Sequence, residues 1–154
     1  TLLAQGIGDV LSKVKPLRQC YITIAKPDCG VNTGAAYHKF DTCGKIHTPD
    51  KFGMLCAVQS RDLNVICSKM ENVFEQFIEN VTAKMYPIVG GIKTKMIMNG
   101  AVNAVMSGSG PTVFGIFNTK DDAESTVDEL EKYCKDVFVC KPVSNGCKIV
   151  EISE

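Results

Sequence analysis

A short loop of small residues separates two apolar runs in the last third of the chain. The runs are residues 101–106 and 112–117, and the loop between them reads Ser-Gly-Ser-Gly-Pro. Short apolar runs bounded by glycine and proline are typical of strands, so the pattern predicts a strand, a tight turn and a second strand. Glycine also lets a backbone come close to a ligand or to another loop. A plain hairpin turn and a ligand-contacting loop are both consistent with these residues.

The rest of the chain mixes strand and helix patterns without regular βαβ alternation. We expect further strands on both sides of a glycine-rich turn in residues 1–17, and at 19–26, 137–143 and 147–152. Residues 144–146 read Ser-Asn-Gly, which favours a reverse turn. We expect helices at 34–40, 48–60, 62–81, 85–99 and 119–134. This order predicts an α+β fold in which helices cover one face of an antiparallel sheet.

Three of these helices have clear start signals or a clear apolar face. Asn32 and Thr33 are good N-cap residues for the helix at 34–40. Thr119, followed three positions later by Asp122, resembles a capping box. Residues 62–81 carry the most regular pattern, with apolar side chains recurring at steps of three and four, so we expect one continuous amphipathic helix there.

Composition excludes several classes of protein. The 154 residues include 17 basic and 17 acidic side chains with no Lys/Arg block, so nothing indicates binding to duplex nucleic acid. No apolar stretch reaches the ~20 residues that span a bilayer, and residues 1–10 lack the charged start and apolar run of a signal peptide. We therefore expect no membrane partner and a cytoplasmic location.

Eight cysteines are spread along the chain. No pair has C-x-x-C spacing and only two histidines are present, which makes a zinc site or any other metal site a weak interpretation. Many of these cysteines lie in apolar runs, where a free thiol behaves as a small hydrophobic side chain. We expect free thiols.

Four segments of the sequence look like motifs that occur together in one group of enzymes. Residues 106–115 read MSGSGPTVFG, a glycine-rich loop, and residues 2–14 read LLAQGIGDVLSKV. Residues 20–37 combine a strand pattern with Lys-Pro, Gly-Val, a threonine and an aromatic residue, and residues 63–79 form a helical pattern that carries Asn-Val-Phe-Glu at 72–75. Together these segments resemble the GHMP kinase superfamily and, within it, the kinases of 4-diphosphocytidyl-2-C-methylerythritol. In that resemblance the loop is similar to the third superfamily motif in the C-terminal domain, residues 2–14 to the passage that leaves the nucleotide domain, and residues 63–79 to a helix with an acidic motif.

The resemblance implies a ferredoxin-like GHMP kinase C-terminal domain at residues 19–154. Residues 1–18 would be a hairpin arm, the tail of a nucleotide-binding half. The implied reaction is ATP-dependent phosphorylation of the 2-hydroxyl of diphosphocytidyl-methylerythritol, in non-mevalonate isoprenoid synthesis. The alternatives are another GHMP small-molecule kinase, of the homoserine or mevalonate type, and a non-catalytic α+β binding module.

The resemblance also assigns a site to this chain. The aromatic ring at position 37 would stack on the cytosine of a cytidine diphosphate substrate, two residues near the start of the same helix would line that wall, and the glycine-rich loop would lie near the substrate and phosphates. These candidate residues are Tyr37, Thr33 and Gly34, with Ser107, Gly108, Ser109 and Gly110 in the loop.

No catalytic residue is assigned to this sequence. The superfamily's P-x-x-x-G-L-x-S-S phosphate loop is absent from it, and the family's catalytic Asp and Lys belong to the N-terminal half. ATP and Mg²⁺ are therefore expected in the full-length enzyme, and neither a cofactor nor kinase activity is expected in this chain alone. The apolar arm, without a nucleotide domain to pack on, is expected to support a weak homodimer.

Overall fold

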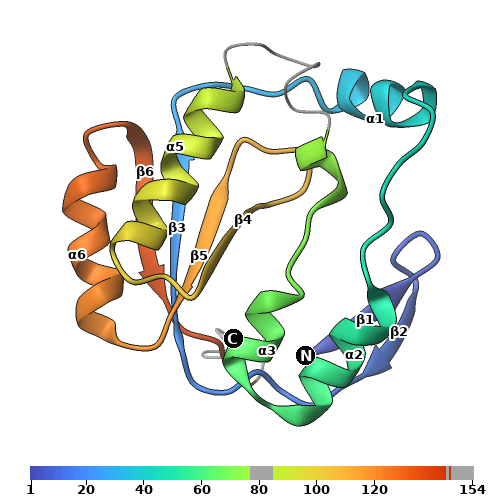
Figure 1. The fold of residues 1–154 in the computed structure, drawn as a ribbon, viewed down its shortest axis with the longest axis horizontal. Coiled ribbons are helices and arrows are strands. Elements are labelled where there is room, and N and C mark those ends of the chain that lie inside the picture. Colours follow the sequence, from blue (N-terminus) through green and yellow to red (C-terminus); the bar gives the residue numbers. More distant parts are fainter. Residues whose placement is uncertain (77–84, 145, 147–154) are drawn as a thin grey trace, which may run out of the picture.

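The computed structural model of the chain describes residues 1–76, 85–144 and 146. Within these residues the strands form two antiparallel sheets (Figure 1). The small sheet pairs β1 (Leu2–Gln5) with β2 (Val10–Lys13), and the main sheet has the strand order β4-β5-β3-β6. The main-sheet strands are β3 (Tyr21–Pro27), β4 (Asn103–Met106), β5 (Val113–Phe117) and β6 (Cys134–Cys140). The predicted α+β class is confirmed.

Two helices cover one face of the main sheet. They are α5 (Met85–Met98) and α6 (Lys120–Leu130), and they lie side by side along the sheet in Figure 1. Gly115 of β5 makes room for this packing, because a Cβ atom there would come within 2.9 Å of the Met96 sulfur. Thr119 caps α6, since its hydroxyl oxygen accepts from the Asp122 amide at 3.2 Å, and the same hydroxyl donates to Asp122 Oδ2 at 2.6 Å. The buried side chains of this core include Ala25, Val89, Ile92, Met96, Val113, Phe117, Ala123 and Leu130.

A smaller apolar cluster lies on the opposite face of the sheet. Side chains alternate along β5, so Ile116 points away from the face that Phe117 and Val113 occupy. Ile116 packs with Cys20 and with Leu63 and Cys67 of helix α3 (Leu63–Ser68). The second face is therefore partly covered as well. Helices α1 (Thr33–Thr42) and α2 (Lys51–Ser60) and the 3₁₀ turn η1 (Val73–Gln76) complete the described elements.

The two-stranded sheet is the predicted N-terminal hairpin. Its strands pair in the register Leu2↔Lys13 to Gln5↔Val10, and it lies apart from the main sheet, beside α2 in Figure 1. The Lys15 ammonium donates to the Gln59 carbonyl at 2.9 Å, which ties the end of the hairpin to α2. The hairpin thus docks on a helix and adds no strand to the main sheet.

The prediction of one continuous helix at residues 62–81 is wrong. Asp62 caps α3, which ends at Ser68, and the chain turns helical again only in η1. The side chains of Asn72 and Glu75 bond to β4, and these bonds hold the segment out of a continuous helix. Residues 77–81 lie outside the described part.

Several other boundaries move by a few residues. Helix α2 begins at Lys51, because the Asp50 carboxylate caps it by accepting from the Gly53 amide at 2.8 Å. Strand β6 begins at Cys134 and not at 137. Helix α6 ends at Leu130, earlier than the expected end at 134. The expected strand at 147–152 and part of the reverse turn before it, at position 145, lie outside the described residues.

The seven described cysteines are free, as predicted, and Cys147 lies outside the described residues. Cys20, Cys67 and Cys134 are buried, whereas Cys56 and Cys140 are exposed. Burial raises the pKa of the Cys67 thiol to about 11. In the same part of the chain no cluster of His, Cys, Asp or Glu is arranged as a metal site, and none of the helices has the length and apolar character needed to span a bilayer.

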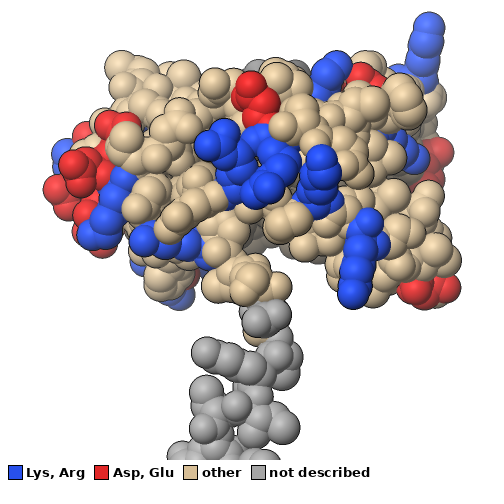
Figure 2. Space-filling model, turned by 90° about the horizontal axis from the view of Figure 1, so that it is seen from below, with Lys and Arg blue, Asp and Glu red and all other residues tan. Residues whose placement is uncertain are grey.

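Charge is balanced in number but unevenly distributed. Figure 2 views the molecule from below, the side on which α2 and α3 lie in Figure 1. Lys and Arg side chains gather across the middle of this face, and most Asp and Glu side chains lie toward its rim. The connection between β4 and β5 lies at the other end of the sheet. The basic surface and the glycine-rich loop therefore occupy different sides of the molecule.

Candidate site around the glycine-rich loop

The glycine-rich loop joins β4 to β5 in a compact turn. The Ser107 amide donates to the Thr112 carbonyl at 2.7 Å, and the Gly110 amide donates to the Ser107 carbonyl at 3.0 Å. Gly108 and Gly110 have φ of +57° and +86°, and a Cβ at Gly110 would come within 2.5 Å of the Met106 sulfur. Two adjacent amides, those of Gly108 and Ser109, donate to no acceptor in the described part of the chain. Free amides in such a turn suit an anionic ligand group.

Helix α1 begins against this loop. The Asn32 side chain caps the helix by accepting from the Ala35 amide at 3.0 Å. The Thr33 hydroxyl then lies 3.1 Å from the hydroxyl of Ser109. Residues four apart in a helix lie on the same face, so Tyr37 stands one turn beyond this contact. The structure thus brings the predicted residues Thr33 and Tyr37 to one side of the glycine-rich loop.

The ring of Tyr37 is half exposed and is supported from one side. Its exposed fraction is 54%, and its centroid lies 5.0 Å from that of Phe74 at an interplanar angle of 76°. Phe40 tilts against the same Phe74 ring at 6.0 Å. An edge-to-face contact of this kind fixes a ring while leaving part of it open to a ligand. Gly34, also predicted for this wall, lies in the first turn of α1 and is exposed.

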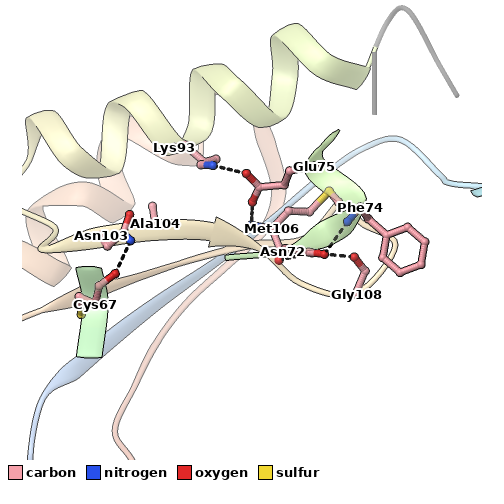
Figure 3. Close-up of polar contacts among 9 residues, drawn as sticks. All are labelled: Cys67, Asn72, Phe74, Glu75, Lys93, Asn103, Ala104, Met106 and Gly108. Carbon is pink, nitrogen blue, oxygen red and sulfur yellow. Dashed lines mark hydrogen bonds and ion pairs between the residues drawn. The ribbon is translucent and has the colours of Figure 1, made fainter. Parts of the chain in front are cut away.

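Asn72 and Glu75 hold the loop from the other side, as Figure 3 shows. The Asn72 side-chain amide donates to the carbonyls of Met106 at 2.6 Å and Gly108 at 2.8 Å. The Met106 amide donates to Glu75 Oε1 at 2.6 Å, and Glu75 Oε2 pairs with Lys93 of α5. From the sequence, the Asn-Val-Phe-Glu motif at 72–75 is expected only to form part of a helix. No local pattern indicated that its polar members bond to the loop.

A cleft of about 420 Å³ opens beside the first half of the loop. A pair of charged side chains lies at its wall, where Lys69 Nζ is 2.9 Å from Asp50 Oδ2. The hydrogen bond from Lys69, helped by the Gly53 amide, lowers the pKa of the Asp50 carboxyl. The cleft is lined by Leu3, Met54, Leu55, Met70 and Phe114, with Asn72, Ser107 and Gly108 on the loop side.

His47 lies on the surface beside the same segment. Its Nε2 atom is 3.1 Å from Glu71 Oε2. Its backbone amide donates to Gln76 Oε1 at 3.0 Å, and the Gln76 side-chain amide donates back to the His47 carbonyl at 2.9 Å. This reciprocal pair fastens the chain before α2 to η1. His38 is exposed on α1 and is not among these contacts.

A family of kinase C-terminal domains matches more than half of the chain, including the glycine-rich loop. Residues 54–136 match the model of the family described as GHMP kinases C terminal, and the chain belongs to that family. Among curated proteins, the chain is 47% identical over 118 residues to a 4-diphosphocytidyl-2-C-methyl-D-erythritol kinase of Lachnospira eligens. That match covers 76% of this chain and 39% of the relative.

A kinase of the same name from Alkaliphilus oremlandii is 36% identical over 150 residues, which cover 97% of this chain and 50% of the relative. The chain therefore spans half or less of the length of these two relatives.

Solved structures share the fold at low sequence identity. A homoserine kinase from Cytophaga hutchinsonii superimposes with a TM-score of 0.70 at 20% identity, covering 90% of this chain and 47% of the other. A 4-(cytidine 5'-diphospho)-2C-methyl-D-erythritol kinase gives 0.68 at 18% identity, covering 91% and 48%. These likenesses establish the fold and do not distinguish between substrates.

Proposed function

We propose that this chain is the substrate-side, C-terminal half of an ATP-dependent kinase that phosphorylates the 2-hydroxyl of 4-diphosphocytidyl-2-C-methylerythritol in non-mevalonate isoprenoid synthesis. One observation carries the proposal. The contact between the hydroxyls of Thr33 and Ser109 joins the start of α1 to the glycine-rich loop. A half-exposed aromatic ring and a turn with free amides then share one surface, which suits a base linked to phosphates.

Each part of the surface has a role in this proposal. The ring of Tyr37 stacks on the cytosine, a contact worth about 1–3 kcal/mol in other base-stacking sites. Thr33 and Gly34 line the wall beside the base. The free amides of Gly108 and Ser109 face the phosphate region, where the Ser107 and Ser109 hydroxyls add further polar contacts. The Gly110 amide is used inside the turn and shapes it.

The N-terminal half of the kinase supplies the phosphoryl-transfer machinery in this proposal. The sequence contains no phosphate loop, and its described part contains no cluster suited to a metal ion. In this proposal ATP and Mg²⁺ bind to that other half, where Mg²⁺ would neutralise phosphate charge. Residues 1–18 are the tail of that half, and residues 19–154 are the C-terminal domain. We place the enzyme in the cytoplasm and assign no catalytic residue to this chain.

A chimera tests the proposal. The chain is joined to the N-terminal half of the Lachnospira eligens kinase, and phosphate transfer from ATP is measured to diphosphocytidyl-methylerythritol, homoserine and mevalonate. Transfer to the cytidine substrate alone is the expected result, and the 154-residue chain by itself is expected to transfer none. The intact Lachnospira kinase is the positive control.

Two outcomes of this assay contradict the proposal. Preference for homoserine or mevalonate would indicate another GHMP kinase. A folded chimera that transfers phosphate to none of the three substrates would favour a non-catalytic module.

A further inference from the structure

Among the strands that the structure describes, β4 has a hydrogen-bonded partner on one side only. It lies at the edge of the main sheet and pairs with β5, so the outward N–H and C=O groups of Met106 face away from the sheet. Side chains fill the place of a neighbouring strand here. Glu75 Oε1 accepts from the Met106 amide and the Asn72 amide donates to the Met106 carbonyl. Both backbone groups at the end of β4 are thereby satisfied, as buried or partly buried backbone groups generally are.

The same Asn72 side chain reaches into the glycine-rich loop. Its Nδ2 atom donates to Gly108 as well as to Met106, so one amide group links the last residue of β4 to the loop. Its Oδ1 atom accepts from the Phe74 amide at 3.0 Å. With the oxygen bonded to an N–H and the nitrogen bonded to two carbonyls, the orientation of the amide is fixed by its partners.

The segment that carries these two side chains also supports Tyr37. Phe74 stands between Asn72 and Glu75 in the sequence, and its ring contacts Tyr37. Glu75 is anchored in turn by Lys93 of α5, with exposed side-chain fractions of 22% and 29%. A single short segment thus contacts the ring of Tyr37, the glycine-rich loop and a core helix, and Figure 3 shows its bonds to the loop and to the helix.

We propose that Asn72 and Glu75 are positioning residues, which set the glycine-rich loop at a fixed distance from the ring of Tyr37. Neither side chain needs to touch the substrate. The two side chains act by holding the glycine-rich loop and the ring of Tyr37 in one relative geometry. This matters for the reaction because small displacements of reacting groups lower the rate by up to about 100-fold. The role in catalysis rests on the proposed function, whereas the effect on the loop does not.

Amide hydrogen exchange on the full 154-residue chain tests the effect on the loop. The reporters are the bonded amides of Met106, Ser107 and Gly110. Asn72→Ala is expected to speed exchange at Ser107 and Gly110 by about tenfold, the effect of losing one or two hydrogen bonds. Glu75→Ala is expected to speed amide exchange at Met106 by a similar factor. Glu75→Gln keeps an acceptor oxygen, so exchange at Met106 should stay close to the native rate.

Asn103 provides a matched control. It is partly buried at the start of β4, and its side-chain amide donates to the Cys67 carbonyl at 2.5 Å, away from the loop (Figure 3). Asn103→Ala is expected to lower the melting temperature without speeding exchange at Ser107 or Gly110 relative to the rest of β4. Equal exchange at these amides in Asn72→Ala and Asn103→Ala would overturn the proposal, and so would unchanged exchange in Asn72→Ala.

Kinetics in the chimera test the role in the reaction. Asn72→Ala is expected to lower kcat by about 10- to 100-fold while KM for the cytidine substrate changes less than about threefold. Asn103→Ala should leave both constants near those of the native chimera. A rise in KM with kcat unchanged would overturn the positioning role in catalysis. An inactive native chimera would count against the proposed function, and exchange at the loop amides would still decide whether Asn72 and Glu75 hold it.

Discussion

The hydroxyl oxygen of Thr33 lies 3.1 Å from that of Ser109, although 76 positions separate them in the sequence. Thr33 opens helix α1, and Ser109 lies at the middle of the glycine-rich loop. Because of this contact, a displacement of helix α1 would also displace the glycine-rich loop. Tyr37 stands one turn further along the same helix, and its ring packs on Phe74, which belongs to the segment that bonds to the loop. The first prediction tests that ring.

Replacing Tyr37 by alanine in the chimera is expected to raise KM for the cytidine substrate by about tenfold or more, because a stacking face worth about 1–3 kcal/mol is lost. KM for ATP should stay nearly unchanged. Loss of binding in both the ground state and the transition state raises KM while leaving kcat close to native. Steady-state kinetics with each substrate varied in turn measure both constants.

Tyr133→Ala is the control for this prediction. Tyr133 has an exposed fraction of 58%, similar to that of Tyr37, and lies under Lys95 between α6 and β6. Its loss should leave both KM values at their native levels. Equal increases in both constants for Tyr37→Ala would mean that the ring supports the fold and does not bind the base.

Gly110 and Gly108 are expected to respond differently to alanine. Both have positive φ, which costs about 1–2 kcal/mol for a residue with a Cβ. At Gly110 the new Cβ would also press on the Met106 sulfur, whereas at Gly108 it would meet no atom of a non-adjacent described residue within 4 Å. Overpacking adds about 1–3 kcal/mol, so Gly110→Ala should be the more destabilising variant in urea unfolding. Equal unfolding free energies would contradict the loop geometry.

Acid should weaken the start of α2 through Asp50. Lys69 and the Gly53 amide lower the pKa of this carboxyl, so its contribution to stability is present above the unfolded value of about 3.9 and is lost as pH falls through the lower folded value. Asn can still cap the helix, so Asp50→Asn isolates the charge. Its stability deficit should be visible at pH 6 and shrink toward pH 3. Asp128→Asn, on the outer side of α6, is the comparison.

Thiol reagents should separate the cysteines by exposure. Cys56 and Cys140 are exposed and should react rapidly in the native chain at pH 7.5. Burial raises the pKa of Cys20, Cys67 and Cys134, which reduces the reactive thiolate fraction, and also blocks access. These three should react only after unfolding. Titration of all eight thiols in denaturant without reductant is the measurement, and a count well below eight would show that disulfides had formed.

The N-terminal hairpin is expected to cause weak self-association. Val10 and Leu11 have exposed fractions of 53% and 55%, and Ile7 at the turn has 97%. Reburial of ~400 Å² of apolar surface would gain on the order of 10 kcal/mol, close to the 4–15 kcal/mol cost of association. Sedimentation should therefore show dimers only at high concentration. Val10→Ser with Leu11→Ser should abolish them, whereas Met98→Ser, another exposed apolar site, should not.

Local signals predicted much of this fold from the sequence. Asn32 caps α1, Thr119 caps α6, and the Ser-Gly-Ser-Gly-Pro loop joins two strands, because each of these features is decided by residues a few positions apart. The expectation of one helix at 62–81 was wrong because residues far apart in the sequence decide the structure of this segment. Its apolar spacing continues through Phe74, so periodicity alone could not reveal that Asn72 and Glu75 bond to a strand more than thirty positions away.

Only part of the candidate site could be named from the sequence, and the binding roles given to its residues stay predictions. Tyr37 and the glycine-rich loop were identified by resemblance, and the structure places the start of α1 against that loop. In the sequence, Phe74 is one more apolar residue of a helical pattern. Only the ring contact with Tyr37 in the structure connects it to the candidate site. Side chains that act on distant backbone groups leave no local pattern in a single sequence.

The bonds of Asn72 also bear on the order in which the chain folds. They span 34 and 36 positions, and the contact between Thr33 and Ser109 spans more. Contacts between residues far apart in sequence pay a larger loop-closure entropy and form slowly. The hairpin of β4 and β5 can form early because it is local, but its loop reaches its final geometry only when segment 72–75 and helix α1 have docked. The candidate ligand surface is thus completed only by non-local contacts, as is the main sheet, in which β3 pairs across still longer separations.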